Sequence, residues 1–186
     1  MHDVYVVPSR LVSTETPFSP SHSILDESKI WEVIKSLSTD EIFNINVKGA
    51  LFCSKYAVKY MKENGGGSIM FTGSPHSDAG ELDRVSYACS KGAVVTLANH
   101  IAKNYGQYNI RSNYITMGWT PTEGELALRK SQGITKEDLE ETAKKIVPMS
   151  RMNTYDDIVP AIIYLLSDNS LMVSGSNIRI TGGWFM

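Results

Sequence analysis

Apolar residues occur along this chain in two patterns, as short continuous runs and as longer stretches with helical spacing. The short runs predict buried β-strands at 3–7, 68–72, 110–116 and 177–180. The helical spacing predicts helices at 38–62, 86–105, 135–147 and 156–166, and a weaker one at 25–34. Two segments rich in turn-forming residues predict loops, 9–22 and 118–133, the second with room for a short helix.

The predicted strands alternate with helices of about ten or more residues, which is typical of βαβ units. In such units the strands are parallel and the helices cover both faces of the sheet. We therefore expect an α/β fold built on one parallel sheet. The sequence shows no internal repeat, no low-complexity segment and no second domain, so we expect a single domain over residues 1–186.

Polar residues and prolines set the predicted ends of several helices. Ser38 and Glu41 have the spacing of a capping box, which predicts a helix start at this point. Thr135 is the predicted N-cap of another helix, and Pro148 is its predicted stop. Pro160 falls within the last predicted helix and is tolerated there only if it lies in the first turn.

Composition and charge exclude several classes of protein. Of the 186 residues, 42% are hydrophobic and 20% are charged, as in globular proteins. The formal net charge is −2, whereas nucleic-acid-binding domains carry a basic excess, so we expect no nucleic-acid partner. No apolar run is long enough to cross a bilayer, and the first residues lack the pattern of a secretory signal. We therefore expect a cytoplasmic protein without a membrane partner.

The cysteines and histidines predict neither disulfides nor a metal site. Cys53 and Cys89 both fall within predicted helices, so we expect reduced, packed thiols. His76 follows Ser74 closely and could line a pocket, but an exposed loop residue is the simpler interpretation. The other histidines form no group with acidic residues at metal-ligand spacing: His2, His22 and His100.

The strongest chemical signal is the pair Tyr87 and Lys91. Their spacing of four places both on one face of a predicted helix. An ammonium group beside a phenol favours the phenolate and lowers the pKa of the tyrosine, which would make Tyr87 a usable proton donor or acceptor. The alternative is chance, because a Tyr and a Lys four apart are common on helices.

Two further polar residues lie at informative places. Ser74 follows a predicted strand, and the carboxyl ends of parallel strands are where open α/β sheets bind ligands. A loop or capping serine is its plain interpretation. Asn46 falls inside a predicted helix, where asparagine is a poor helix former. Its plain interpretation is an exposed helix residue.

Taken in order, these residues resemble the motifs of the short-chain dehydrogenase/reductase family over roughly residues 3–186. The matching segments are Asn46-Val-Lys-Gly49, Gly67-Ser-Ile-Met-Phe-Thr-Gly-Ser74, Tyr87-x-x-x-Lys91, Ile110-Arg-Ser-Asn113, Met117-Gly118-x-x-x-Thr122, Pro148-Met-Ser-Arg151 and Ser174-Gly175 to Gly182-Gly183. The resemblance implies a Rossmann-like, doubly wound parallel sheet. It also implies hydride transfer between NAD or NADP and a small-molecule carbonyl or alcohol substrate.

The resemblance also assigns roles to single residues. Tyr87 would exchange a proton with the substrate oxygen, and Ser74 would hydrogen-bond that oxygen. Lys91 would lower the pKa of Tyr87 and, with it, hold the nicotinamide ribose. Asn46 would hold a water molecule of a proton relay. The cofactor's carboxamide would be contacted by the backbone at Gly118 and by Thr122, while no metal is implied.

The sequence departs from the family pattern at three places. Met117 replaces the proline of the family's Pro-Gly turn, and the strand at 3–7 is followed by Pro-Ser-Arg where the family has Asn-Asn-Ala-Gly. The largest departure is the opening strand, glycine loop and helix, which bind the cofactor's pyrophosphate and have no counterpart here. The glycines at 65–67 precede a strand, whereas the phosphate loop follows one. We therefore expect a sheet truncated at its N-terminal half and weak or absent dinucleotide binding.

Three interpretations of function stay open. The first is an NAD(P)-dependent oxidoreductase of the short-chain type, which is inactive if the missing half is essential. The second is a cofactor-free remnant that serves as an oligomerisation or interaction subunit. The third is that the sequence omits an N-terminal part of a longer protein. A relation to halohydrin dehalogenases is disfavoured, because those relatives carry Arg where this chain has Lys91.

The resemblance further predicts assembly into a homo-dimer or homo-tetramer. Relatives pack their two long helices, here 39–62 and 86–105, against a neighbouring subunit. In the family the strand at 3–7 pairs on both sides, and an edge left open invites pairing with another chain. We expect this strand to be covered by a partner, distorted or poorly ordered.

Overall fold

Four parallel strands form a sheet in the computed structural model, which describes residues 3–7, 38–78, 80 and 84–184. The strands are β1 (Asp3–Val7), β2 (Gly67–Gly73), β3 (Ile110–Met117) and β4 (Asn177–Ile180). They lie side by side in this order, and every neighbouring pair is parallel. The four predicted strands and their parallel arrangement are therefore confirmed.

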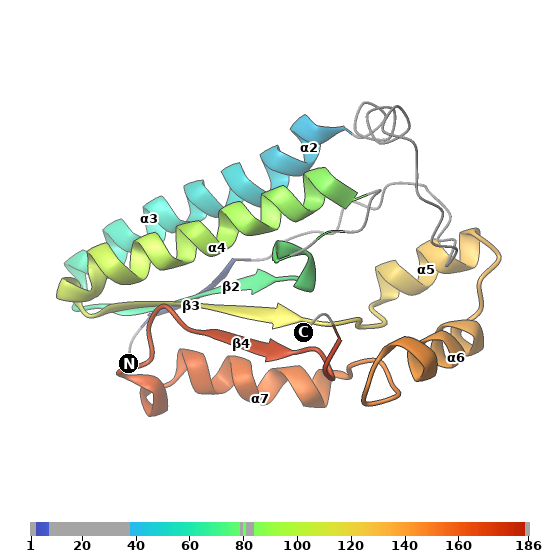
Figure 1. Cartoon of the computed structure of the whole chain (residues 1–186). Helices are drawn as coiled ribbons and strands as arrows, with labels where there is room; N and C mark the ends of the chain where they lie inside the picture. Colours follow the sequence, from blue (N-terminus) through green and yellow to red (C-terminus); the bar gives the residue numbers. More distant parts are fainter. Residues whose placement is uncertain (1–2, 8–37, 79, 81–83, 185–186) are drawn as a thin grey trace.

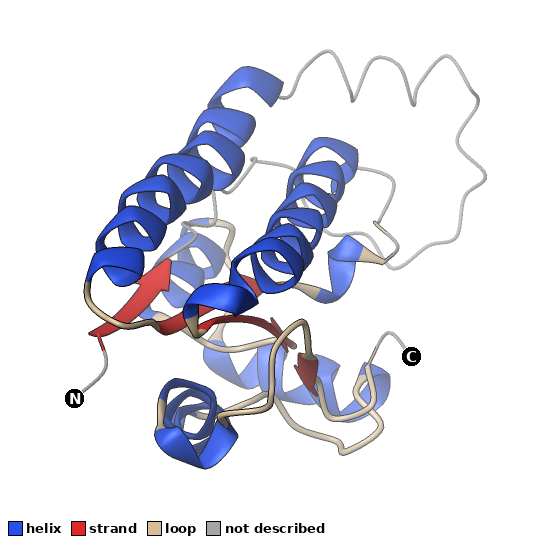
Figure 2. Cartoon of the chain, turned by 90° about the vertical axis from the view of Figure 1, so that its left-hand side faces the viewer, coloured by secondary structure: helices blue, strands red, loops and turns tan. Residues whose placement is uncertain are grey.

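Helices cover both faces of the sheet, as Figures 1 and 2 show. On one face lie α3 (Gly49–Glu63) and α4 (Val85–Tyr105), and on the other lies α7 (Tyr155–Leu166). Beyond the end of β3 lie α5 (Glu123–Ser131) and α6 (Lys136–Ile146). This is the expected α/β arrangement, and it leaves the carboxyl ends of β2, β3 and β4 at one edge.

Each face of the sheet contributes to its own hydrophobic core, because side chains of a strand alternate between the two faces. On β2, Ile69 and Phe71 face α3 and α4, whereas Met70 faces α7. A third cluster joins α6 to the loops near it. The buried members of the three clusters are Ala50, Ala57, Val58, Met61, Ile69, Phe71, Val94, Ala98, Ile101, Ile110 and Tyr114, then Met70, Ile115 and Leu165, then Leu139, Ala143, Val147 and Met152.

The predicted helix caps are correct at Thr135 and wrong at Ser38. Thr135 caps α6 in a capping box, in which its hydroxyl accepts from the Asp138 N–H at 3.1 Å and Asp138 accepts from the Thr135 N–H at 2.9 Å. The capping box at Ser38 is wrong, although a helix does begin after it. Ser38 has ψ of 73°, outside the extended conformation that aims a capping side chain, and its side chain makes no capping hydrogen bond.

The place of Pro160 also differs from the prediction. A capping box between Thr154 and Asp157 starts α7 at Tyr155, so Pro160 is the sixth residue of the helix and lies beyond its first turn. Proline has no N–H to donate to the carbonyl of Asp156, one turn earlier. Both residues are exposed, so water can serve that carbonyl in place of the missing donor.

The prediction for the two cysteines has a mixed outcome. Cys53 and Cys89 are free, as expected, but both are exposed rather than packed, because α3 and α4 bury other faces. The predicted loop at 9–22 and the weak helix at 25–34 lie outside the described residues. Strand β1 is a described edge strand with β2 as its partner.

Candidate active site

Asn46 lies in a π-helical turn, η1 (Asn44–Lys48), between α2 (Thr39–Phe43) and α3. The predicted uninterrupted helix at 38–62 is therefore three segments. The turn directs Asn46 inward, where only 2% of the residue is exposed, so the interpretation as a surface residue is wrong. Its amide nitrogen donates to the Ser90 hydroxyl at 3.0 Å, while its Oδ1 is buried without a hydrogen-bond partner. Single π turns of this kind occur often at functional sites.

Ser74 is the first residue after β2 and is buried. Its extended backbone (φ −149°, ψ 150°) ends the strand and caps the short turn η2 (Pro75–Ser77). Its N–H donates to the Tyr114 hydroxyl at 3.1 Å. The plain interpretation as a capping serine is therefore correct in part, since the Ser74 hydroxyl accepts from the His76 N–H at 3.3 Å.

Tyr87 and Lys91 lie one turn apart on α4, and both are buried. The Lys91 ammonium lies 5.5 Å from the centre of the Tyr87 ring and donates to the Thr72 carbonyl at 3.1 Å. Burial lowers the pKa of Lys91 to about 8. Burial likewise raises the pKa of Tyr87 to about 12, against a hydrogen bond from Ser74 that lowers it.

The expected lowering of the Tyr87 pKa by Lys91 is therefore not what the structure shows. The loss of hydration destabilises the Tyr87 phenolate more than the hydrogen bond from Ser74 stabilises it. Burial therefore decides that the pKa of Tyr87 rises. The same loss of hydration favours the uncharged amine at Lys91. The site holds Tyr87 as a phenol throughout the neutral range.

Hydrogen bonds link the three segments of the chain that carry the predicted catalytic residues, which are Asn46, Ser74, Tyr87 and Lys91. Ser74 and Tyr87 hydrogen-bond to each other. Asn46 reaches Ser90, which lies between Tyr87 and Lys91 on α4 and donates to the Tyr87 carbonyl at 2.7 Å. The structure thus brings together the end of β2, the π-helical turn and one face of α4.

His76 belongs to the same cluster, although the sequence favoured an exposed loop residue. It is 6% exposed, because η2 packs against α4 directly after the strand. Its Nδ1 lies 3.1 Å from the Ser74 hydroxyl oxygen. Its ring meets the Tyr87 ring edge to face, with centroids 5.7 Å apart. The one signal in the sequence was the position of His76, two residues after Ser74.

Gly118 and Thr122 lie beyond the carboxyl end of β3, at the same edge of the sheet as Ser74. The Gly118 N–H donates to the Ile180 carbonyl at 2.8 Å, and a Cβ on Gly118 would lie 2.8 Å from the Cα of Thr181. The Thr122 hydroxyl accepts from the Glu125 N–H at 3.3 Å at the start of α5. A hydroxyl that accepts in this way can still donate its proton.

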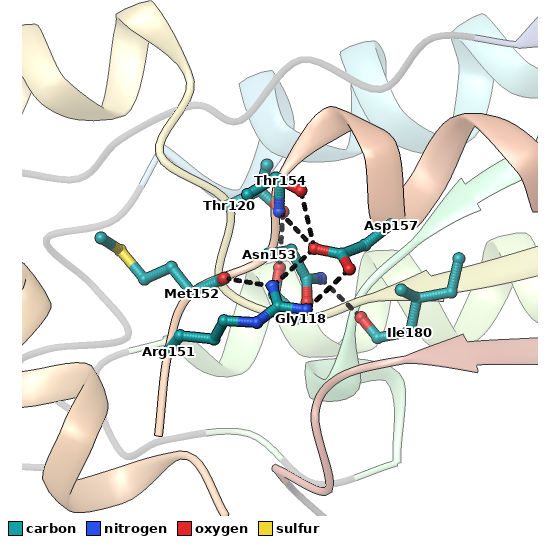
Figure 3. Close-up of polar contacts among 8 residues, drawn as sticks. All are labelled: Gly118, Thr120, Arg151, Met152, Asn153, Thr154, Asp157 and Ile180. Atoms are coloured by element: carbon teal, nitrogen blue, oxygen red, sulfur yellow. Dashed lines mark hydrogen bonds and ion pairs between the residues drawn. The ribbon is translucent and has the colours of Figure 1, made fainter. Parts of the chain in front are cut away.

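An ion pair braces the loops at this edge against the start of α7 (Figure 3). Arg151 contacts both carboxylate oxygens of Asp157, at 2.6 and 2.8 Å, which holds the pKa of Asp157 well below its usual range. Next to it, Asn153 donates from its side chain to the Ile180 carbonyl at 2.6 Å and from its N–H to the Trp119 carbonyl at 2.8 Å. Asn153 therefore ties the loop before α7 to the segment after β3 and to the last residue of β4.

The described residues form neither a metal site nor a membrane-spanning helix. The described part of the chain holds no group of three His, Cys, Asp or Glu side chains placed to bind a metal ion. Within that part, no helix combines the length and apolar character needed to cross a membrane.

Comparison with known proteins points to one family. The model of the family described as enoyl-(acyl carrier protein) reductase matches residues 23–185. An uncharacterized oxidoreductase of Thermotoga maritima is 36% identical over 144 residues, which are 77% of this chain and 57% of that protein. The chain spans little more than half the length of the curated relatives it matches.

Solved structures with bound nicotinamide cofactors share the fold. The structure of ElxO with NADP bound has a TM-score of 0.71 and 26% identity, over 78% of this chain and 57% of that one. A 7α-hydroxysteroid dehydrogenase in complex with NADH and 7-oxo glycochenodeoxycholic acid has a TM-score of 0.69 and 30% identity. It covers 78% of this chain and 55% of that one.

Proposed function

The chain belongs to the short-chain dehydrogenase/reductase family, and we propose that it is an NAD(P)-dependent oxidoreductase acting on a carbonyl or alcohol substrate. The observation that carries this proposal is the buried contact between Ser74 and Tyr87 beside the Lys91 ammonium. Three buried polar groups that meet at the carboxyl end of a parallel strand are costly for the fold, and this edge is where open α/β sheets bind ligands.

Tyr87 acts as the proton donor when a carbonyl is reduced. Its phenol is protonated near neutral pH, since burial raises its pKa to about 12. Ser74 donates a hydrogen bond to the same substrate oxygen and so stabilises the charge that develops on it. Lys91, whose pKa is about 8, is mostly charged at neutral pH and stabilises the phenolate that proton transfer leaves behind.

Asn46 completes a route for the proton. Its Oδ1 is a buried acceptor without a partner, and an ordered water molecule is the usual way to satisfy such a group. The nitrogen of the same amide contacts Ser90, which lies between Tyr87 and Lys91 on α4, so a water held by Asn46 would be near the site. Such a water would pass a proton from solvent to the Tyr87 phenolate after each carbonyl reduction.

The residues present fit the nicotinamide half of the cofactor. Tyr87 and Lys91 offer a phenol and an ammonium to the ribose hydroxyls, and Lys91 is held at the site by the Thr72 carbonyl. The Gly118 carbonyl, whose own N–H is paired with Ile180, and the hydroxyl proton of Thr122 would hold the carboxamide. When bound, the nicotinamide gives a hydride to the carbonyl carbon or takes one from the alcohol.

The pyrophosphate half of the cofactor has no comparable support in the described residues. Strand β2 runs into Ser74 and the turn η2, and β3 runs into the braced segment at Gly118, so neither leads into a glycine loop and helix. We therefore predict weak dinucleotide binding by the chain. Isothermal titration with NADH and NADPH measures this, and a micromolar dissociation constant would contradict the prediction.

Carbonyl reduction tests the proposal directly. The chain is incubated with aldehydes and ketones at high NADH or NADPH concentration, and the absorbance of the reduced nicotinamide is followed. Tyr87→Phe should lower the rate by about 10² to 10⁴, because it removes the proton donor, and should reduce cofactor affinity much less, because Lys91 still contacts the ribose. Equal rates for Tyr87→Phe and the parent chain would contradict the proposed chemistry.

A second role as an assembly unit is favoured by the surface of α3. Phe52, Tyr56 and Tyr60 are spaced by four and lie on the outward side of the helix, 59%, 67% and 46% exposed. A row of exposed aromatic side chains is typical of a protein interface. We propose that α3 and α4 join two copies of this chain in a homo-dimer or homo-tetramer, which is compatible with the enzymatic role.

A further inference from the structure

His76 presents two polar groups to a single oxygen atom, the hydroxyl of Ser74. The His76 N–H donates to this oxygen at 3.3 Å, and Nδ1 of the imidazole lies 3.1 Å from it. The ring is buried and is held edge to face against the Tyr87 ring, with an interplanar angle of 71°. The contact between His76 and Ser74 is thus fixed by backbone and side chain together.

The hydrogen-bonding capacity of a serine hydroxyl decides what this contact does. A hydroxyl has one proton to donate and can accept two hydrogen bonds. The His76 N–H takes one of the two acceptor positions of Ser74. If Nδ1 carries a proton, it takes the second, and the Ser74 proton can then point only away from His76. If Nδ1 lacks a proton, it accepts the Ser74 proton itself.

The direction in which the Ser74 O–H bond points matters for the proposed reaction. A substrate carbonyl oxygen needs a donor, and a serine that turns its lone pairs toward it repels it. Ser74 donates a side-chain hydrogen bond to Tyr87, which lowers the pKa of that phenol, so the freed proton has an acceptor within the proposed site. The Ser74 N–H is already engaged with the Tyr114 hydroxyl, so the backbone cannot replace the side chain as donor.

We propose that His76 is a positioning residue: its protonated Nδ1 donates to Ser74 and thereby holds the Ser74 hydroxyl as a donor toward the substrate oxygen. This rests on the proposed function, because it specifies how that site polarises a carbonyl. His76 itself touches neither the substrate nor the cofactor. Its effect passes through the orientation of one O–H bond.

The protonation of Nδ1 can be measured without any turnover. Histidine labelled with ¹⁵N in the whole chain reports the proton at each ring nitrogen by NMR, and His76→Asn assigns the His76 signals. We expect a proton on Nδ1 of His76, and we expect Ser74→Ala to shift this nitrogen signal. A His76 Nδ1 without a proton in the parent chain, or a signal unchanged in Ser74→Ala, would overturn the proposal.

Two variants of His76 test the same role by steady-state kinetics. Asparagine at position 76 keeps an amide N–H near the place of Nδ1, whereas glutamine moves the amide toward the place of Nε2. We expect His76→Asn to keep kcat for carbonyl reduction within about threefold, and His76→Gln to lower kcat on the order of tenfold at nearly constant KM. Equal kcat values for the two variants, or a loss confined to KM, would count against the positioning role.

The two arms separate this inference from the proposed function. If the parent chain reduces no carbonyl with either cofactor, the proposed function fails by itself. The NMR arm still decides whether His76 donates to Ser74. If carbonyl reduction is observed and Nδ1 lacks a proton, the proposed function stands and the role of His76 is wrong.

Discussion

Asn46 and Ser90 are joined by a hydrogen bond of 3.0 Å between residues 44 positions apart. It connects the π-helical turn η1 to the face of α4 that carries Tyr87 and Lys91. Ser90 then donates to the Tyr87 carbonyl at 2.7 Å. The position of Tyr87 therefore depends on a turn in another helix, and this dependence can be measured.

A double-mutant cycle of Asn46→Ala and Ser90→Ala measures that connection. Each substitution removes one partner of a buried hydrogen bond, so each should lower the free energy of unfolding by about 1–3 kcal/mol. Because both act on the same bond, the double variant should lose less than the two single losses together, with a coupling of about 1 kcal/mol. Denaturant unfolding provides the values, and a coupling near zero would mean that the bond contributes nothing.

Gly73→Ala should disturb the contact between Ser74 and Tyr114 by a steric clash. A Cβ on Gly73 would overlap the ring of Tyr114, whose hydroxyl holds the Ser74 N–H. We expect the free energy of unfolding to fall by about 1–3 kcal/mol, as for other overpacked cores. Gly106→Ala is the matched control, since a Cβ there meets nothing within 4 Å and φ is −56°. A loss of equal size in both variants would show that the Tyr114 contact is not the cause.

Lys91 should make the protein more stable as the pH rises. Its pKa is about 8 in the folded chain and about 10.5 in an unfolded one, so between these values the unfolded state binds more protons. Stability then increases with pH across this window, by on the order of 3 kcal/mol for complete titration. Unfolding from about pH 7 to about pH 10 measures the rise, and it should be much smaller in Lys91→Met. Identical pH dependence in the two proteins would contradict the burial of a charged Lys91.

Asp157 should show a pH dependence of the same sign in the acidic range. Its pKa is held below the usual range by Arg151, so the pairing stabilises the fold at neutral pH and is lost as the pH falls through the carboxylate range. Asp157→Asn keeps an acceptor for the Thr154 N–H but removes the charge. Its stability should therefore lie below that of the parent at neutral pH and approach it in acid. A constant difference across this range would assign the effect to the cap alone.

Much of the fold could be predicted because its signals are local. The strands at 3–7 and 177–180 are continuous apolar or alternating runs between turn residues, and the structure gives them the predicted bounds. The capping box at Thr135 needs only residues within one helical turn. The shared face of Tyr87 and Lys91 likewise follows from helical spacing.

The details of the site could not be predicted in the same way, because they depend on contacts between distant segments. The π-helical turn at Asn46 is stabilised by Ser90 on another helix. His76 is buried because its turn packs under α4, which no pattern around position 76 indicates. The pKa of Tyr87 follows from burial and not from the spacing to Lys91, which was the only information in the sequence.

The outward face of α3 carries the last prediction. Phe52 and Tyr56 lie one turn apart and are more than half exposed, so two copies of the chain can bury them against each other. Tyr56→Glu places a charge in such an interface, where it cannot be hydrated. We expect it to shift the chain to a smaller species in sedimentation velocity at an unchanged content of helix by circular dichroism.

The layer opposite α3 offers the control for this experiment. Tyr155 at the start of α7 is 63% exposed, close to the 67% of Tyr56, but it lies on the other side of the sheet. Tyr155→Glu adds the same charge to a similar surface, so it should leave the sedimentation coefficient unchanged if α3 and α4 form the interface. If Tyr155→Glu dissociates the oligomer and Tyr56→Glu does not, the interface lies on α7 and not on α3. A parent chain that sediments as a monomer at all concentrations would remove the interface altogether, and the exposed aromatic side chains of α3 would then need another partner.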